Sequence, residues 1–95
     1  MAEPDYPIAL IPAHNEEATV GIIVAQVREP WNYPVVVIDD CSSDATAQAA
    51  RNAGATVLPL TLQLGAWGAI QTGLRYALRQ GYRTAITLDA DGQHE

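Results

Sequence analysis

Residues 35–46, VVVIDDCSSDAT, decide the fold of this chain. Four consecutive apolar residues lead directly into two aspartates, and so short and continuous an apolar run is typical of a strand buried on both faces. Ser42 or Ser43 then stands where it can cap a helix, and the alanine-rich residues that follow favour that helix. A doubly buried strand followed at once by a helix predicts an α/β protein with a parallel sheet.

A similar unit precedes this stretch. Residues 7–13, PIALIPA, are again continuously apolar and predict a buried strand. Asn15 follows as a candidate N-cap, with Glu16 and Glu17 in the first turn, where the helix dipole favours negative charge. The apolar stripe of this helix is formed by Val20, Ile23, Val24 and Val27.

Two further strands and one helix follow the opening stretch. Gly54 is placed to end the second helix, and residues 55–60, ATVLPL, predict a third strand. Pro59 indicates that this strand lies at an edge of the sheet or ends early, because proline cannot donate to a central ladder. Residues 65–81 predict a helix, and residues 82–89, YRTAITLD, a fourth strand. We expect the following residues of that helix to face inward: Trp67, Ile70, Leu74, Ala77 and Leu78.

The order of elements is therefore strand, helix, strand, helix, strand, helix, strand. Right-handed crossovers then give a Rossmann-like, mostly parallel four-stranded sheet with helices on both faces and the strand order 3-2-1-4. Ninety-five residues are enough for one domain, spanning residues 1–95, with a modest core.

Composition excludes several classes of protein. The formal net charge is −6, with five arginines and no lysine, which argues against nucleic acid or an anionic membrane surface as a partner. The single Cys41 excludes an internal disulfide and fits a reducing compartment. The N-terminus lacks the apolar core of a signal peptide, and no apolar run approaches the roughly 20 residues of a membrane span. We therefore expect a cytoplasmic protein without a transmembrane segment.

Polar clusters follow the first, second and fourth predicted strands: PAHNEE, DDCSSD and DADGQH. In a sheet of this order they meet at one edge, where such sheets bind ligands. Neighbouring carboxylates there repel by roughly 4 kcal/mol at 4 Å and an effective dielectric near 20. No lysine or arginine lies within the clusters, so a hard divalent cation is the natural partner. Each residue alone also has a structural explanation: Asp40 as a helix cap, DADG as a tight turn, and His14 as a surface residue.

The motifs resemble those of one known family. IPAHNEE, VVVIDDCSSDAT, LGAWGAIQTGLRYA and ITLDADGQHE occur in the order and spacing of the nucleotide-binding half of family 2 glycosyltransferases with the GT-A fold. The resemblance is strongest to the dolichyl- and polyprenyl-phosphate mannose or glucose synthase branch. It implies an enzyme that transfers a sugar from a nucleoside-diphosphate sugar, with Mn or Mg, to an acceptor such as polyprenyl phosphate.

The resemblance also implies roles for individual residues. Pro12, His14 and Glu16 match the loop that lines the base and ribose pocket, with His14 in place of the more usual tyrosine. Asp40 matches the carboxylate that recognises the base. Residues 64–68 depart from the usual pattern, so the resemblance gives no diphosphate contact there. The remaining matches concern the metal motif: Asp89 and Asp91 bind the cation and the sugar nucleotide, and Gln93 completes the metal shell. No catalytic residue is identifiable.

In the family an acceptor half follows the Asp-x-Asp motif, and none is present in these residues. We therefore expect a fragment or a donor-binding half, with a homodimer formed through the exposed fourth strand. The alternative is a non-catalytic nucleotide-binding or interaction module derived from a glycosyltransferase. A sugar-phosphate nucleotidyltransferase fits less well, because its glycine-rich basic loop after the first strand is absent.

Overall fold

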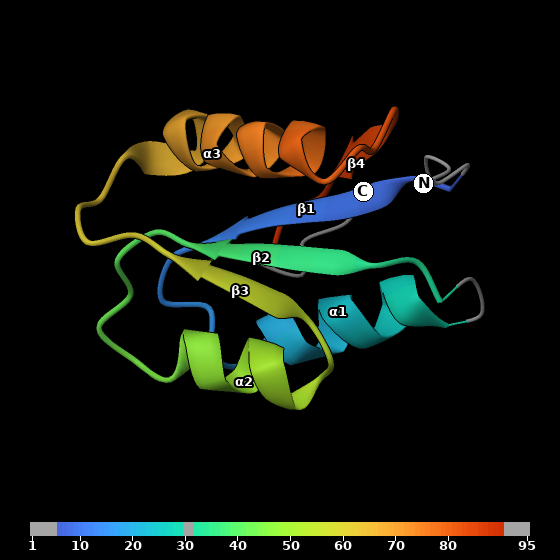
Figure 1. Ribbon diagram of the computed structural model, residues 1–95. Helices are drawn as coiled ribbons and strands as arrows, with labels where there is room; N and C mark the ends of the chain where they lie inside the picture. Colours follow the sequence, from blue (N-terminus) through green and yellow to red (C-terminus); the bar gives the residue numbers. More distant parts are fainter. Residues whose placement is uncertain (1–5, 30–31, 91–95) are drawn as a thin grey trace.

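The computed structural model describes residues 6–29 and 32–90. Its strands are β1 (Ile8–Ala13), β2 (Val35–Asp39), β3 (Thr56–Pro59) and β4 (Ala85–Thr87), and its helices are α1 (Val20–Arg28), α2 (Thr46–Asn52) and α3 (Gly65–Arg79). All strand pairs are parallel, and the order is β3-β2-β1-β4. The predicted sheet order is confirmed. Helices α1 and α2 cover one face of the sheet and α3 covers the other (Figure 1).

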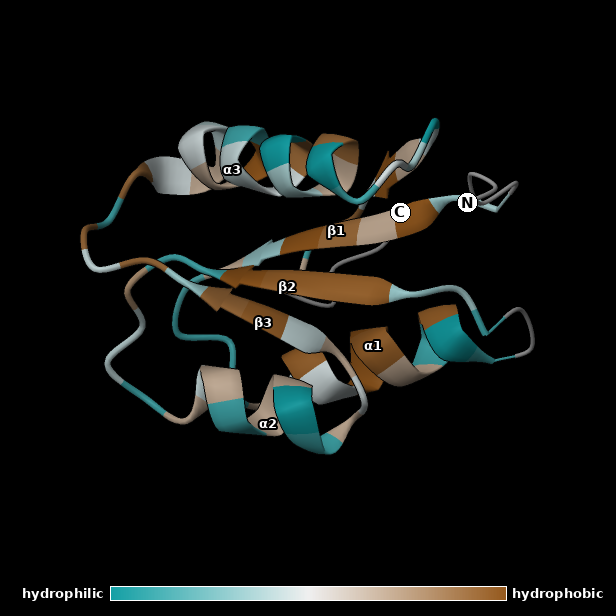
Figure 2. Cartoon of the chain, in the orientation of Figure 1, coloured by the Kyte–Doolittle hydropathy of each residue, from teal (hydrophilic) through white to brown (hydrophobic). Residues whose placement is uncertain are grey.

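The two central strands supply both halves of the core. Every residue of β2 is buried, as are five of the six residues of β1, and both strands are apolar along almost their whole length (Figure 2). Alternate residues point to opposite faces. Ala9 and Ile11 therefore pack with Val24 of α1, whereas Leu10 and Ile38 pack with Ala69 of α3. This two-sided burial is what the continuous apolar runs predicted.

The predicted ends of β3 and α2 are confirmed. Strand β3 lies at one edge of the sheet and ends at Pro59. Proline has no N–H to donate, and this is tolerated at the end of an edge strand because no central strand loses a hydrogen bond. Gly54 follows the C-cap of α2 and adopts a φ of 104°, a conformation that glycine accepts without strain from a Cβ.

The predicted helix starts are wrong for α1 and α2. Helix α1 begins only at Val20, so Glu16 and Glu17 precede it, and Asn15 adopts a left-handed φ of 54° instead of capping. Asparagine is one of the few residues besides glycine that adopt this conformation, and the Asn15 side chain accepts a hydrogen bond from the Ser43 N–H of the neighbouring loop. Helix α2 begins at Thr46, so neither Ser42 nor Ser43 caps it.

The predicted inward face of α3 is wrong at Trp67, Leu74 and Leu78, which are exposed, whereas Ala77 is buried and Ile70 is half-buried. The buried residues of α3 are Ala69, Gly73 and Ala77, whereas Trp67 and Leu78 are 69% and 76% exposed. Small side chains let this helix approach the sheet closely. A Cβ on Gly73 would lie only 2.8 Å from Cδ1 of Ile38. The larger apolar residues therefore remain on the outward face.

Candidate functional site

Three loops meet at the carboxyl edge of the sheet, after β1, β2 and β4 (Figure 1). Two of them are joined through the main chain and the side chain of Asn15. The Asn15 N–H donates to Oγ of Ser42 at 2.9 Å, and the Ser43 N–H donates to Oδ1 of Asn15 at 2.8 Å. The Thr19 hydroxyl also donates to the carbonyl of Ala90, which connects the first loop to the segment after β4. The loops therefore hold one another in place.

Thr46 is fully buried beneath these loops, and its hydroxyl forms hydrogen bonds with polar groups of two of them. Its hydroxyl accepts a hydrogen bond from the Glu16 N–H at 2.8 Å and donates to the carboxylate of Asp44. The hydrogen bond from the Thr46 side chain lowers the pKa of Asp44 below its ordinary value, because it stabilises the ionised form. Sequence reasoning missed this role, although a threonine two residues after an aspartate at a helix start is a recognisable local signal.

Asp40 is almost fully buried, and both of its carboxylate oxygens bind the start of α3. Oδ1 accepts from the Leu64 N–H at 2.7 Å, and Oδ2 accepts from the Gly65 N–H at 2.9 Å. These N–H groups belong to the first turn of a helix, which leaves them without intrahelical partners. Asp40 therefore anchors α3 to the end of β2. Each oxygen retains a second lone pair for a ligand.

His14 is fixed by the main chain of Asp40. Nδ1 of His14 lies 2.7 Å from the Asp40 carbonyl oxygen. A carbonyl only accepts, so Nδ1 carries the proton, and in the neutral ring Nε2 is an acceptor. Asp40 thus holds the first loop through its carbonyl and α3 through its carboxylate.

The residues around these contacts enclose a pocket of about 180 Å³ at the carboxyl edge. Five of the six residues expected to bind a sugar nucleotide line it: Pro12, His14, Glu16, Asp40 and Asp89. The sixth, Asp91, lies outside the described residues. Ala13, Ala66 and Ala90 complete the lining. Their small side chains leave space between the polar groups, a contribution that sequence reasoning did not anticipate.

The expected metal ligands are only partly described. Asp89 is exposed, and its carboxylate has no hydrogen-bond partner within residues 6–29 and 32–90. Gln93 lies outside the described residues together with Asp91. Within the described ranges, no three histidine, cysteine, aspartate or glutamate residues lie close enough together to hold a metal ion. Asp89 contributes to the pocket lining a carboxylate that has no hydrogen-bond partner among the described residues.

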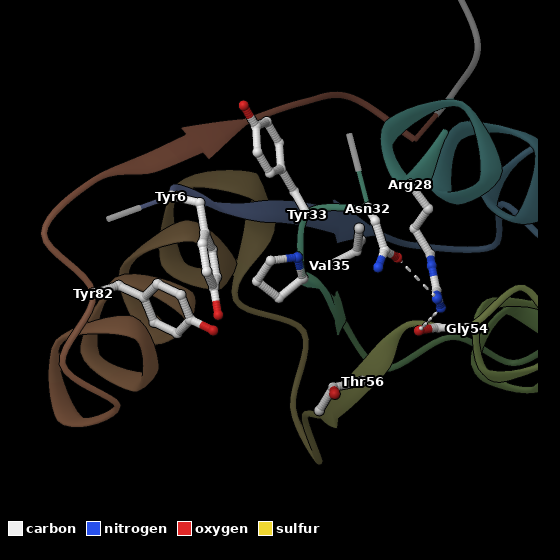
Figure 3. A pocket seen from close by; sticks show the side chains of 9 residues that line it. Tyr6, Arg28, Asn32, Tyr33, Val35, Gly54, Thr56 and Tyr82 are labelled. Carbon is white, nitrogen blue, oxygen red and sulfur yellow. Dashed lines mark hydrogen bonds between the residues drawn. The ribbon is translucent and has the colours of Figure 1, made fainter. Parts of the chain in front are cut away.

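A larger hollow of about 540 Å³ lies at the opposite, amino edge of the sheet. Figure 3 shows Tyr6, Tyr33 and Tyr82 on one side of it and Arg28 on the other. The Arg28 guanidinium donates to the Gly54 carbonyl at 2.8 Å, at the C-terminal end of α2. Burial, and to a lesser degree Tyr6, raises the pKa of Tyr82. Arg28 thus connects the ends of α1 and α2 beside this hollow.

Among the helices described here, none is long and apolar enough to cross a membrane. A four-stranded parallel sheet covered by helices on both faces defines a doubly wound α/β domain, and open sheets of this kind bind ligands at their carboxyl edge. A model of the family described as Glycosyl transferase family 2 matches residues 8–95. The chain belongs to this family.

Relatives of known sequence agree with this assignment. An uncharacterized protein of Methanocaldococcus jannaschii is 37% identical over 90 residues, which are 95% of this chain and 37% of that protein. The undecaprenyl-phosphate mannosyltransferase of Micrococcus luteus is 32% identical over 94 residues, which are 93% of this chain and 39% of that protein. The chain therefore spans well under half of the length of either relative.

A solved structure shares the fold. A mannosyltransferase of Pyrobaculum calidifontis, in complex with GDP-Man and Mn²⁺, superposes with a TM-score of 0.69 at 26% identity. The superposition covers 94% of this chain and 29% of that one. The GT-A type of sheet expected from the sequence is thereby confirmed.

Proposed function

We propose that this chain is the donor-binding part of a glycosyltransferase and binds a nucleoside-diphosphate sugar at the carboxyl edge of its sheet. The observation that carries the proposal is the single pocket lined by five of the six expected binding residues. It lies where β1 and β4 adjoin, the point at which the strand order reverses. Ligands of open α/β sheets bind at such points. The family reaction would transfer the sugar to an acceptor such as polyprenyl phosphate.

Different residues of the pocket would contact different parts of the ligand. Pro12 near the end of β1, with His14 and Glu16 in the loop that follows, would hold the base and ribose. Asp40 would accept a hydrogen bond from a ring N–H of the base, using the lone pairs that α3 leaves free. A volume of about 180 Å³ is below the roughly 300–1,000 Å³ typical of drug-sized ligands. The pocket would therefore hold one part of the nucleotide, with the diphosphate lying along the open edge near Asp89.

A divalent cation, Mn or Mg, would be held by Asp89, Asp91 and Gln93. Carboxylate and amide oxygens suit these hard cations. The chain contains no lysine, and no arginine lines the pocket, so its own side chains provide no local counter-charge to a diphosphate. When bound, the cation would stabilise the negative charge that develops on the leaving diphosphate. A single cysteine in the chain is consistent with action in the cytoplasm.

Titration calorimetry with UDP and GDP, each in Mn²⁺, in Mg²⁺ and in chelator, tests this function. We expect binding in the presence of metal and a loss of at least about tenfold in affinity in chelator, equivalent to about 1.4 kcal/mol. Asp89→Ala and Asp91→Ala should weaken binding in metal far more than in chelator. Glu29→Ala, an exposed carboxylate at the end of α1, is the matched control and should leave affinity unchanged.

Equal affinity with and without metal would contradict the proposed site. Release of free sugar from UDP- or GDP-sugars by the chain, measured beside the calorimetry, separates catalysis from binding alone. Metal-dependent binding without any turnover would favour the alternative of a non-catalytic nucleotide-binding module.

A further inference from the structure

The outward face of α3 carries an uncharged stripe, here called the α3 stripe. Its members are Leu64, Trp67, Gln71, Leu74 and Leu78. Leu64 precedes the helix directly, and the four apolar members are between 41% and 76% exposed. The spacing alternates between three and four residues, which is the pattern of a seam between two paired helices.

Within residues 6–29 and 32–90, neither core cluster includes a member of this stripe. The opposite face of α3, with Ala69, Gly73 and Ala77, makes the contact with the sheet. Contiguous exposed apolar surface on one helix is unusual for a monomeric protein and marks an interaction site. Because the seam has the helix-pairing spacing, the occupant it fits is another α-helix.

The α3 stripe is complementary to itself. Leu64 and Leu78 lie about two turns before and after Gln71, and Trp67 and Leu74 lie about one turn before and after it. An antiparallel pair of α3 helices with a two-fold axis at Gln71 therefore sets Leu64 against Leu78 of the second copy. The two Gln71 amides meet at the axis, where each can donate to the other and accept from it. A closed two-fold contact of this kind is the commonest form of self-association.

Charge is compatible with a second copy. Arg75 and Arg79 line a hollow on the β3 side of α3, together with Leu58 and Pro59, and so flank the stripe on one side only. In the antiparallel arrangement Arg75 lies opposite Gly68 of the second copy, so no arginine faces another. The stripe itself contains no charged side chain that pairing would bury.

We infer that two copies of this chain associate through antiparallel pairing of their α3 stripes. The alternative surface for a second copy, the edge strand β4, is less suitable. It has only three residues and exposes one large apolar side chain, Ile86, at 40%. Very short edge strands offer few ladder bonds to a partner and are a common protection against pairing.

Sedimentation equilibrium across the micromolar range tests the pairing. The wild-type chain is expected to be in monomer–dimer equilibrium, and Leu74→Gln together with Leu78→Gln should raise the dimer dissociation constant by at least about tenfold. Ile22→Gln is the matched control, since Ile22 is 58% exposed on α1, away from the stripe. A wild-type chain that stays monomeric overturns the inference. A double variant that dimerises as strongly as the wild type also overturns the inference, and would assign the contact to another surface such as β4.

Cross-linking tests the register. Residue 71 should meet its own copy at the axis, so Gln71→Cys, made with Cys41→Ser, should form a covalent dimer under a mild oxidant such as copper–phenanthroline. Ile22→Cys with Cys41→Ser should not. A Gln71→Cys chain that dimerises in sedimentation but gives no more cross-linked product than the control overturns the antiparallel register.

Discussion

Replacing Asp40 with asparagine should destabilise the fold strongly, because Asp40 anchors α3. The two carboxylate oxygens accept hydrogen bonds from the Leu64 and Gly65 N–H groups at 2.7 and 2.9 Å, and the side chain is 3% exposed. An asparagine has one acceptor oxygen and one NH₂ group. One of the two N–H groups would therefore face a donor and lose its partner.

The magnitude follows from these two contacts. A hydrogen bond to a charged group contributes about 1.5–3 kcal/mol, and a buried donor left unsatisfied costs about 1–3 kcal/mol. Removing a buried charge also relieves part of its desolvation, which offsets some of the loss. We therefore expect Asp40→Asn to lower the free energy of unfolding by about 2–4 kcal/mol. For a domain of this size that is a fall in Tm of the order of 10 °C or more.

Urea unfolding followed by circular dichroism measures the change. Asp89→Asn is the control, because Asp89 is exposed and its carboxylate has no partner among the described residues. That variant should stay within about 0.5 kcal/mol of the wild type. If Asp40→Asn costs no more than Asp89→Asn, the anchoring of α3 by Asp40 is refuted.

The same position also tests recognition of the base. If Asp40 accepts a ring N–H of the base, Asp40→Ala should weaken uracil and guanine nucleotides more than adenine nucleotides, which lack that donor. Calorimetry at a temperature where the variant remains folded gives the comparison. An equal loss for all three bases would mean that Asp40 acts only by holding α3.

Three further predictions concern stability. Gly54→Ala should lower the free energy of unfolding, measured in urea, more than Gly81→Ala does. Both glycines have positive φ, so an alanine at either position adds about 1–2 kcal/mol of backbone strain, but only at Gly54 would the new Cβ lie 1.8 Å from Arg28 Nη1. Equal costs would show that Arg28 moves aside freely. Thr46→Val should destabilise by about 1–3 kcal/mol, because the Glu16 N–H loses its acceptor and the Asp44 carboxylate loses one of its donors. Thr46→Ser should retain most of the stability, and equal losses would exclude the hydroxyl as the cause. Because the pKa of Asp44 is lower in the folded state, its ionised form stabilises the fold fully when the pH is above the ordinary pKa of 3.8, and this contribution is lost as the pH falls through the folded-state pKa. Asp44→Asn should therefore make the free energy of unfolding depend less on pH in the acid range. An unchanged acid limb would contradict this linkage.

The sequence predicts the architecture well because the strands are chemically distinct from everything around them. Continuous apolar runs such as residues 35–38 fit only strands buried on both faces, and the crossover rule then leaves few orders for the sheet. Pro59 and Gly54 are likewise identified by backbone chemistry that no other residue shares. These features are local, so a single sequence reveals them.

The sequence does not predict which side of α3 is buried, because the helix has two faces that both look apolar. Trp67, Leu74 and Leu78 form the more hydrophobic stripe and were expected inward. The sheet instead selects Ala69, Gly73 and Ala77, since the space left by Ile38 admits only small side chains. That choice depends on the distance between two elements, which periodicity does not contain.

The sequence predicts which loops form the candidate site, but it does not predict the contacts between their side chains. The placement of three polar clusters at one edge follows from the sheet order alone. The contacts within the site do not: Asn15 reaches Ser43, and Asp40 reaches Leu64, across segments far apart in the chain. Which partner a short polar side chain selects depends on the final positions of both loops.

The position of β4 has a consequence for how the chain is synthesised. Strand β1 is made first, yet one of its two edges is paired only when Ile8 to Leu10 meet Ala85 to Thr87, near the other end of the described chain. On the ribosome, β1, α1 and β2 can assemble while α3 is still being translated. One edge of β1 then stays open until residues 85–87 have emerged. The exposure time of an apolar strand edge is thus set by translation, and slow codons in residues 60–85 would lengthen the interval in which nascent chains can aggregate.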